Sequence, residues 1–156
     1  MYKFEKSVLI TLCSAQKGTK MSRKLSRSEA RCEAFKLIFE LNQHMDDVDF
    51  LFDNLMNEVP QSISSMPYIK NVVLGVMDKY DELSEAISEN LAGGWRLERI
   101  SKVARAVLML AIYEIRYVDD VPDKVAINEA LELAKKFDEP DSSAFVNGVL
   151  AGVVKK

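Results

Sequence analysis

Four basic side chains near the amino end of the sequence could hold phosphate groups. Arg27 and Arg31 are spaced i, i+4, and Lys24 precedes Arg27 by three, so a helix there would place them along one side, close to Arg23. Guanidinium groups offer forked donors suited to phosphate oxygens, and counterion release adds a salt-dependent attraction. The pattern favours contact with nucleic acid, although a merely solvated basic face accounts for the charge equally well.

Phosphate contacts alone do not distinguish one nucleic-acid sequence from another. Recognition of single-stranded RNA usually adds aromatic stacking and hydrogen bonds to base edges. Phe145 lies near the start of a predicted helix, close to Asp141, and the two could supply these contacts. A core position for the phenyl ring and a helix-capping position for the carboxylate are the alternatives.

Other residue types give no pattern typical of an enzyme. His44 is the single histidine and Cys32 is one of two cysteines, and neither lies near a second group that would complete a catalytic or metal site. Gly93-Gly94 is a hinge rather than a phosphate-binding loop, and no nucleotide-binding or zinc-protease motif occurs. We therefore expect no catalysis, no metal and no cofactor.

Two polar side chains on predicted apolar helix faces indicate structural contacts. Glu114 falls beside Ala111 and Ile115, where an unpaired carboxylate would be very costly, so we expect it to be tied to a neighbouring helix. Asn147-Gly148 lies inside the last predicted helix. Glycine is unfavourable there by about 1 kcal/mol relative to alanine, which predicts a compensating close helix contact that Asn147 could reinforce.

The elements that must position these residues are helices. Apolar residues recur with a helical period from Ser26 onward, and no segment alternates with the period of a strand. We expect an all-α fold of about seven helices in two packed subbundles, about 26–91 and 95–155, with a seam at 92–94. Ser26 or Ser28 can cap the first helix, and the proline- and serine-rich stretch 58–67 reads as a loop.

Composition sets the broad class. The 156 residues are 48% hydrophobic and 29% charged, which is typical of one soluble domain, here 22–156, and no run approaches the ~20 apolar residues of a membrane span. Residues 1–36 carry nine Lys/Arg against three Asp/Glu, whereas the remainder is strongly acidic. We expect residues 1–21 to be disordered or the result of a mis-assigned start codon, because Met21 offers a second plausible start. We also expect the protein to be cytoplasmic.

Four segments resemble the family of the transcription antitermination factor NusB. They are SEARCEAFKLIF at 28–39, AVLMLAIYE at 106–114, VPDKVAINEALELAK at 121–135 and FVNGVL at 145–150. The resemblance covers roughly residues 22–154, and the last two segments, in that order and spacing, are very specific. It implies an all-helical, non-catalytic protein that binds boxA RNA together with NusE and helps to load an antitermination complex onto RNA polymerase, notably in ribosomal RNA operons.

The resemblance also assigns roles to individual positions. Arg23, Lys24, Arg27 and Arg31 correspond to the basic amino-terminal residues of the family, and Asp141 and Phe145 to its RNA-side positions. Phe39 stands where members often have Tyr on the surface that faces NusE. Ala104 stands where some members carry an acidic residue on that surface.

Two other interpretations remain open at this point. The chain could be the NusB-like part of a ribosomal RNA cytosine methyltransferase, although it has no room for a cofactor-binding α/β domain. It could also be a protein-interaction bundle without RNA binding, including a homodimer that covers its basic face.

Overall fold

The predicted all-α architecture is confirmed. The computed structural model describes residues 23–44 and 46–155, so the expectation for residues 1–21 lies outside the described part. The described residues form α2 (Arg27–Gln43), α3 (Val48–Glu58), α4 (Met66–Asp78), α5 (Tyr80–Glu89), α6 (Lys102–Tyr117), α7 (Asp123–Phe137) and α8 (Ser142–Val154). Two short 3₁₀ helices lie in the connections: η1 (Pro60–Ser65) between α3 and α4, and η2 (Leu97–Arg99) between α5 and α6. No helix in these residues is long and apolar enough to cross a membrane.

Helix α2 begins where its sequence predicts. The Ser26 hydroxyl accepts a hydrogen bond from the backbone N–H of Glu29, and the Glu29 carboxylate accepts one from the backbone N–H of Ser26. This reciprocal capping box satisfies two amides that a helix start would otherwise leave unpaired. It fixes the first turn of α2, on which the predicted basic residues lie.

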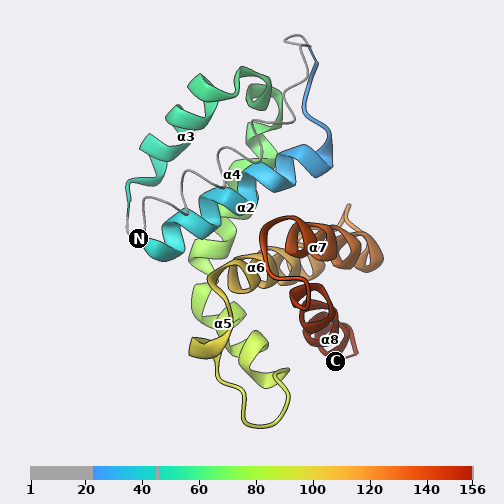
Figure 1. Ribbon diagram of the computed structural model, residues 1–156. Helices are drawn as coiled ribbons and strands as arrows, with labels where there is room; N and C mark the ends of the chain where they lie inside the picture. Colours follow the sequence, from blue (N-terminus) through green and yellow to red (C-terminus); the bar gives the residue numbers. More distant parts are fainter. Residues whose placement is uncertain (1–22, 45, 156) are drawn as a thin grey trace.

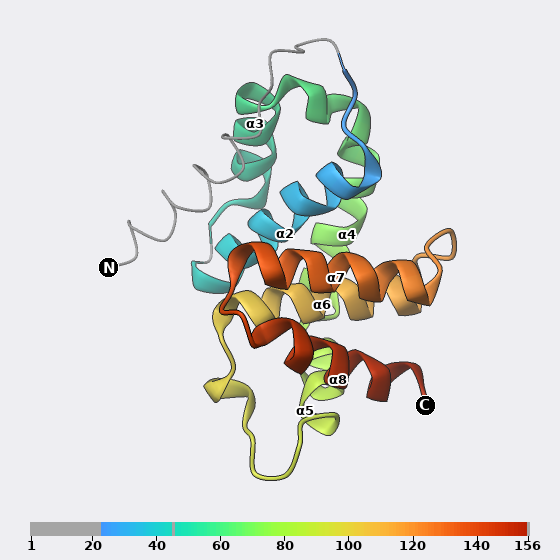
Figure 2. The ribbon, with the colours of Figure 1, turned by 45° about the vertical axis from the view of Figure 1, so that its right-hand side comes forward.

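Helix α6 is the central element. Every residue from Ala106 to Glu114 is buried, because α6 is covered on several sides by α2, α4, α5, α7 and α8. Figures 1 and 2 show α2, α3 and α4 on one side of it and α7 and α8 on another. Residues on α6 can therefore contact side chains from both halves of the chain.

Helix α5 contacts helices from the carboxy-terminal half of the chain. Helix α5 packs on α6 and α8 through Leu83, Ala86 and Ile87, and so belongs with the carboxy-terminal helices. The chain passes from one group to the other at Lys79, between α4 and α5. The residues predicted as the seam, 92–94, form an exposed turn in which Gly94 adopts a positive φ of 83°.

The segment predicted as a loop at 58–67 is also largely helical. Pro60 lies in the first turn of η1 and Pro67 in the first turn of α4. Proline is well tolerated at a helix start, because its missing N–H would have no partner within the helix there. The prolines at this point mark helix beginnings rather than an irregular connection.

The close helix contact predicted at Asn147-Gly148 lies elsewhere. Both residues are exposed, and a Cβ atom added to Gly148 would meet nothing within 4 Å. The contact lies one turn further along α8, where a side chain at Gly152 would overlap the carboxamide of Asn90 at the end of α5. The contact predicted at Asn147 was therefore placed wrongly, because α8 meets the end of α5 at Gly152.

Candidate nucleic-acid interface

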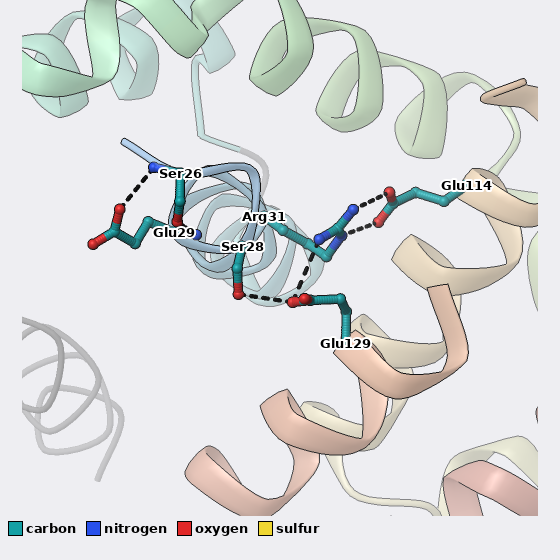
Figure 3. A network of polar contacts seen from close by, with 6 residues as sticks. All are labelled: Ser26, Ser28, Glu29, Arg31, Glu114 and Glu129. Atoms are coloured by element: carbon teal, nitrogen blue, oxygen red, sulfur yellow. Dashed lines mark hydrogen bonds and ion pairs between the residues drawn. The ribbon is translucent and has the colours of Figure 1, made fainter. Parts of the chain in front are cut away.

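Arg31 is buried at the junction of three helices. Its side chain is 3% exposed and that of Glu114, on α6, is 1% exposed. Arg31 donates from Nε to Oε1 of Glu114 at 2.6 Å and from Nη2 to Oε2 at 2.9 Å (Figure 3). Such bidentate pairing satisfies both buried charges and fixes their geometry. The inter-helix tie expected for Glu114 is present, and its partner is Arg31.

A third helix joins this contact. Arg31 Nη1 lies 3.4 Å from Oε2 of Glu129 on α7, and the Ser28 hydroxyl donates to the same oxygen at 2.8 Å. Burial by itself lowers the pKa of the Arg31 guanidinium, but the hydrogen bonds and charge of Glu114 outweigh burial and raise it. The cation is therefore permanent, and it links α2 to both α6 and α7 (Figure 3).

The burial of Arg31 corrects its assignment as a phosphate ligand. The guanidinium is buried and already paired with Glu114 and Glu129, so it offers a phosphate oxygen almost no accessible donor. The i, i+4 spacing suggested that Arg31 shares the exposed side of Arg27, but the residue is turned far enough around α2 to face α6 and α7. Arg31 is a structural residue that supports the basic end of α2.

Arg27 lies one turn earlier and remains accessible. Its side chain is 46% exposed, and Nη2 lies 3.3 Å from Oδ2 of Asp120 in the connection before α7. The guanidinium stacks over the ring of Tyr68, with its central carbon 4.3 Å from the ring centroid. Burial and the charge of Glu114 raise the pKa of the Tyr68 hydroxyl, so the ring presented to Arg27 stays neutral. Arg27 is thus held in place while its outer side faces solvent.

Arg23 and Lys24 extend this exposed positive end. Arg23 pairs with the carboxylate of Glu29, and both of these side chains are substantially exposed. Lys24 is exposed, and within the described residues it has no ion-pair partner. Exposed ion pairs contribute only about 0–1 kcal/mol, so phosphate oxygens could replace the carboxylates at little cost. We call Arg23, Lys24 and Arg27 the cationic end.

Asp141 and Phe145 lie at the start of α8. Asp141 occupies the N-cap position, yet its exposed carboxylate makes no capping hydrogen bond and therefore remains able to accept one from a ligand. The phenyl ring of Phe145 is half-buried, and its centroid lies 6.1 Å from that of Trp95. The side chain of Asp141 therefore does not cap α8, and the ring of Phe145 is only partly buried in the core.

Asp138 organises this region and was not identified from the sequence. Its Oδ2 accepts hydrogen bonds from the hydroxyls of Ser101, at the start of α6, and Ser142, at the start of α8. Its Oδ1 accepts the backbone N–H of Glu139. The carboxylate therefore fixes the α7–α8 connection against the beginning of α6. The sequence did not single out Asp138, because its partner Ser101 is 37 positions away.

The cationic end and the Asp141–Phe145 pair lie at opposite ends of α7. Arg27 contacts Asp120 just before α7, whereas Asp141 follows its last residue. A helix of 15 residues is about 22 Å long at about 1.5 Å per residue. The two groups therefore do not converge on one pocket. They suit an extended ligand rather than a compact one.

The two positions assigned to a protein partner are buried. Phe39 is 7% exposed and lies beside Phe35 in the core, and Ala104 is 2% exposed in the first turn of α6. The expectation that these side chains form part of an open surface is wrong, because both are packed into the core between helices. In the described part of the chain, no three His, Cys, Asp or Glu side chains are placed to hold a metal ion.

Comparison with known proteins places this arrangement in a family. The sequence model of the NusB family matches residues 28–155. The transcription antitermination protein NusB of Levilactobacillus brevis is 43% identical over 129 residues, covering 81% of this chain and 91% of that protein. The same protein of Clostridium botulinum is 39% identical over 138 residues, covering 87% of this chain and all of that protein.

Solved structures show the same fold. NusB of T. maritima superposes with a TM-score of 0.78 at 30% identity, covering 86% of this chain and 94% of that structure. A chain from the crystal structure of the antitermination factors NusB and NusE in complex with dsRNA superposes with a TM-score of 0.72 at 23% identity. That superposition covers 83% of this chain and 96% of the other.

Proposed function

Because the chain belongs to the NusB family, whose similar members are named as transcription antitermination proteins and not as enzymes, we propose that it is an RNA-binding antitermination factor. Its RNA is of the boxA type, its protein partner is NusE, and the pair joins an RNA polymerase antitermination complex on ribosomal RNA operons. Support for the partners comes from the solved assembly in which a protein of this fold occurs with NusE and RNA.

The observation that carries this proposal is the accessible cationic end beside a rigid buried contact. The cationic end faces solvent: two of its side chains pair with exposed carboxylates, and the third is solvated. These residues are Arg23, Arg27 and Lys24, respectively. Phosphate groups would take over these hydrogen bonds and release counterions, which gives affinity without sequence preference. Arg31 and Glu114 keep α2 fixed on α6 and so hold these cations in position.

Sequence preference requires the opposite end of α7. The uncapped carboxylate of Asp141 can accept hydrogen bonds from base amino groups, and the half-buried ring of Phe145 offers an edge or face to a base. An RNA strand lying along α7 would contact both ends. NusE would enlarge the bound surface, so we expect weak, salt-sensitive binding to RNA alone and tighter binding by the pair.

The test is a titration of boxA RNA with and without NusE at two salt concentrations, comparing the wild type with Arg23→Glu/Arg27→Glu. Each lost phosphate contact should lower the slope of log affinity against log salt by about 1. Lys79→Glu/Lys155→Glu is the matched control: it makes the same change in net charge elsewhere, at Lys79, whose side chain is 40% exposed, and at the exposed Lys155. Equal affinity and equal slope in the two double variants would contradict the proposal.

A further inference from the structure

Trp95 is a large aromatic side chain that the core does not use. It is the only tryptophan in the chain, and its side chain is 55% exposed. The turn at Gly94, with φ 83°, and a hydrogen bond from the backbone N–H of Trp95 to the carbonyl of Ala92 present it to solvent. Its position is thus set by the backbone turn rather than by burial.

The indole forms one wall of an open hollow. The hollow has a volume of about 560 Å³, and Trp95 lines it together with Leu91, Arg96 and Arg99. Beside the hollow, the indole centroid lies 6.1 Å from that of the Phe145 ring, with 41° between the ring planes. Two aromatic rings from segments fifty positions apart therefore lie close together, and one of them, Trp95, lines the hollow with Arg96 and Arg99.

Charge distinguishes this hollow from an ordinary apolar groove. Arg96 and Arg99 are both exposed, and no carboxylate among the described residues forms an ion pair with either. Glu98 also lines the hollow, so its charge partly offsets the two cations. Paired aromatic rings with adjacent unpaired guanidiniums match a nucleotide, which has a flat base on one side and a phosphate on the other.

The surrounding segments are held firmly enough to act as a preformed surface. Arg105, on α6, donates from Nη2 to the backbone carbonyl of Leu97 and anchors η2 at 3.2 Å. Asp138 joins Ser101, just after η2, to Ser142, one turn before Phe145. The segment that carries Trp95 and the helix that carries Phe145 are therefore connected through the same carboxylate.

We propose that Trp95 and Phe145 form a stacking platform for one unpaired base of a single-stranded RNA, with Arg96 and Arg99 holding the adjoining phosphate. This inference rests on the proposed function and deepens it: Trp95 joins Phe145 in holding the base, and Arg96 and Arg99 add a phosphate contact. The strand would then run from the cationic end, past α7, to the hollow beside Trp95.

Tryptophan fluorescence gives a direct test, because the chain has a single indole. Stacking of a base on Trp95 should quench its emission as boxA RNA is added to the protein with NusE. Trp95→Ala should weaken RNA binding by roughly 5- to 150-fold, the range for one lost base stack, and Trp95→Phe should recover part of that loss. Phe50→Ala removes an equally exposed aromatic ring on α3 and should leave RNA affinity unchanged.

RNAs with one base removed at each position identify the stacked nucleotide. At that position, base removal should weaken binding by the wild type but not by Trp95→Ala, whereas at other positions both proteins should respond alike. The proposal is overturned if Trp95→Ala binds RNA like Phe50→Ala while Arg23→Glu/Arg27→Glu binds it weakly. It is also overturned if Trp95→Ala weakens binding to NusE alone, which would make the hollow a protein contact. If Arg23→Glu/Arg27→Glu bound RNA as tightly as the wild type, that result would instead count against the proposed function.

Discussion

The first two turns of α2 carry the same side chain in opposite surroundings. Arg27, in the first turn, is 46% exposed and pairs with an exposed aspartate, whereas Arg31, in the second, is 3% exposed and pairs with a buried glutamate. Sequence spacing alone treats the two as equivalent. A cationic side chain that no neighbouring helix covers can contact a ligand. One that neighbouring helices bury joins those helices through an ion pair.

Arg31→Ala should give the largest effect on stability. It leaves the Glu114 carboxylate buried without its partner, which typically lowers the free energy of unfolding by about 3–5 kcal/mol. Urea denaturation followed by circular dichroism measures the loss. A companion variant, Arg31→Met/Glu114→Met, removes both charges and should recover most of the stability. A loss below about 1 kcal/mol in Arg31→Ala would mean that the contact with Glu114 is not a structural tie.

Arg31→Lys should show that charge alone does not maintain this contact. Lysine keeps the positive charge but cannot make the bidentate pair with Glu114, and losing one hydrogen bond to a charged group costs about 1.5–3 kcal/mol. At a temperature where the variant is folded, its RNA affinity should have the same salt dependence as that of the wild type. A reduced salt slope would return Arg31 to the set of phosphate contacts.

Arg27→Ala should change stability little and RNA binding more. An exposed ion pair contributes about 0–1 kcal/mol, and an exposed stack on an aromatic ring about 0.5–1 kcal/mol. A double-mutant cycle with Asp120→Ala at low and high salt measures the pair, and its coupling should shrink as salt rises. A coupling energy as large as that between Arg31 and Glu114 would contradict the distinction between a weak, exposed ion pair at Arg27 and a strong, buried one at Arg31.

The smallest effect concerns pH at the first turn. The hydrogen bond from the Ser26 backbone N–H, with a further contribution from Arg23, lowers the pKa of Glu29. The ionised carboxylate therefore stabilises the fold above its unfolded-state pKa, and this contribution is lost as the pH falls through the lowered folded-state value. Glu29→Gln should flatten this part of the stability profile, measured by thermal unfolding between neutral and acidic pH. An unchanged acidic limb would contradict the capping contribution of Glu29.

Local patterns predicted the helices well, because capping and helical periodicity depend on neighbours in the sequence. Ser26 with Glu29 begins α2 as these residue types suggest, and the apolar residues at the centre of α6 are buried. The prolines at 60 and 67 misled for the same local reason: proline is compatible with a turn and with a helix start, and only the structure distinguishes them.

Residue types and spacing were enough to predict helices, a basic amino end and the need of Glu114 for a partner. The packing of the helices determined that this partner is Arg31, 83 positions away, and that Trp95 meets Phe145. It also decided that Phe39 and Ala104 are covered. Periodicity specifies which residues share a helix face, whereas burial and pairing depend on which other helix packs against that face.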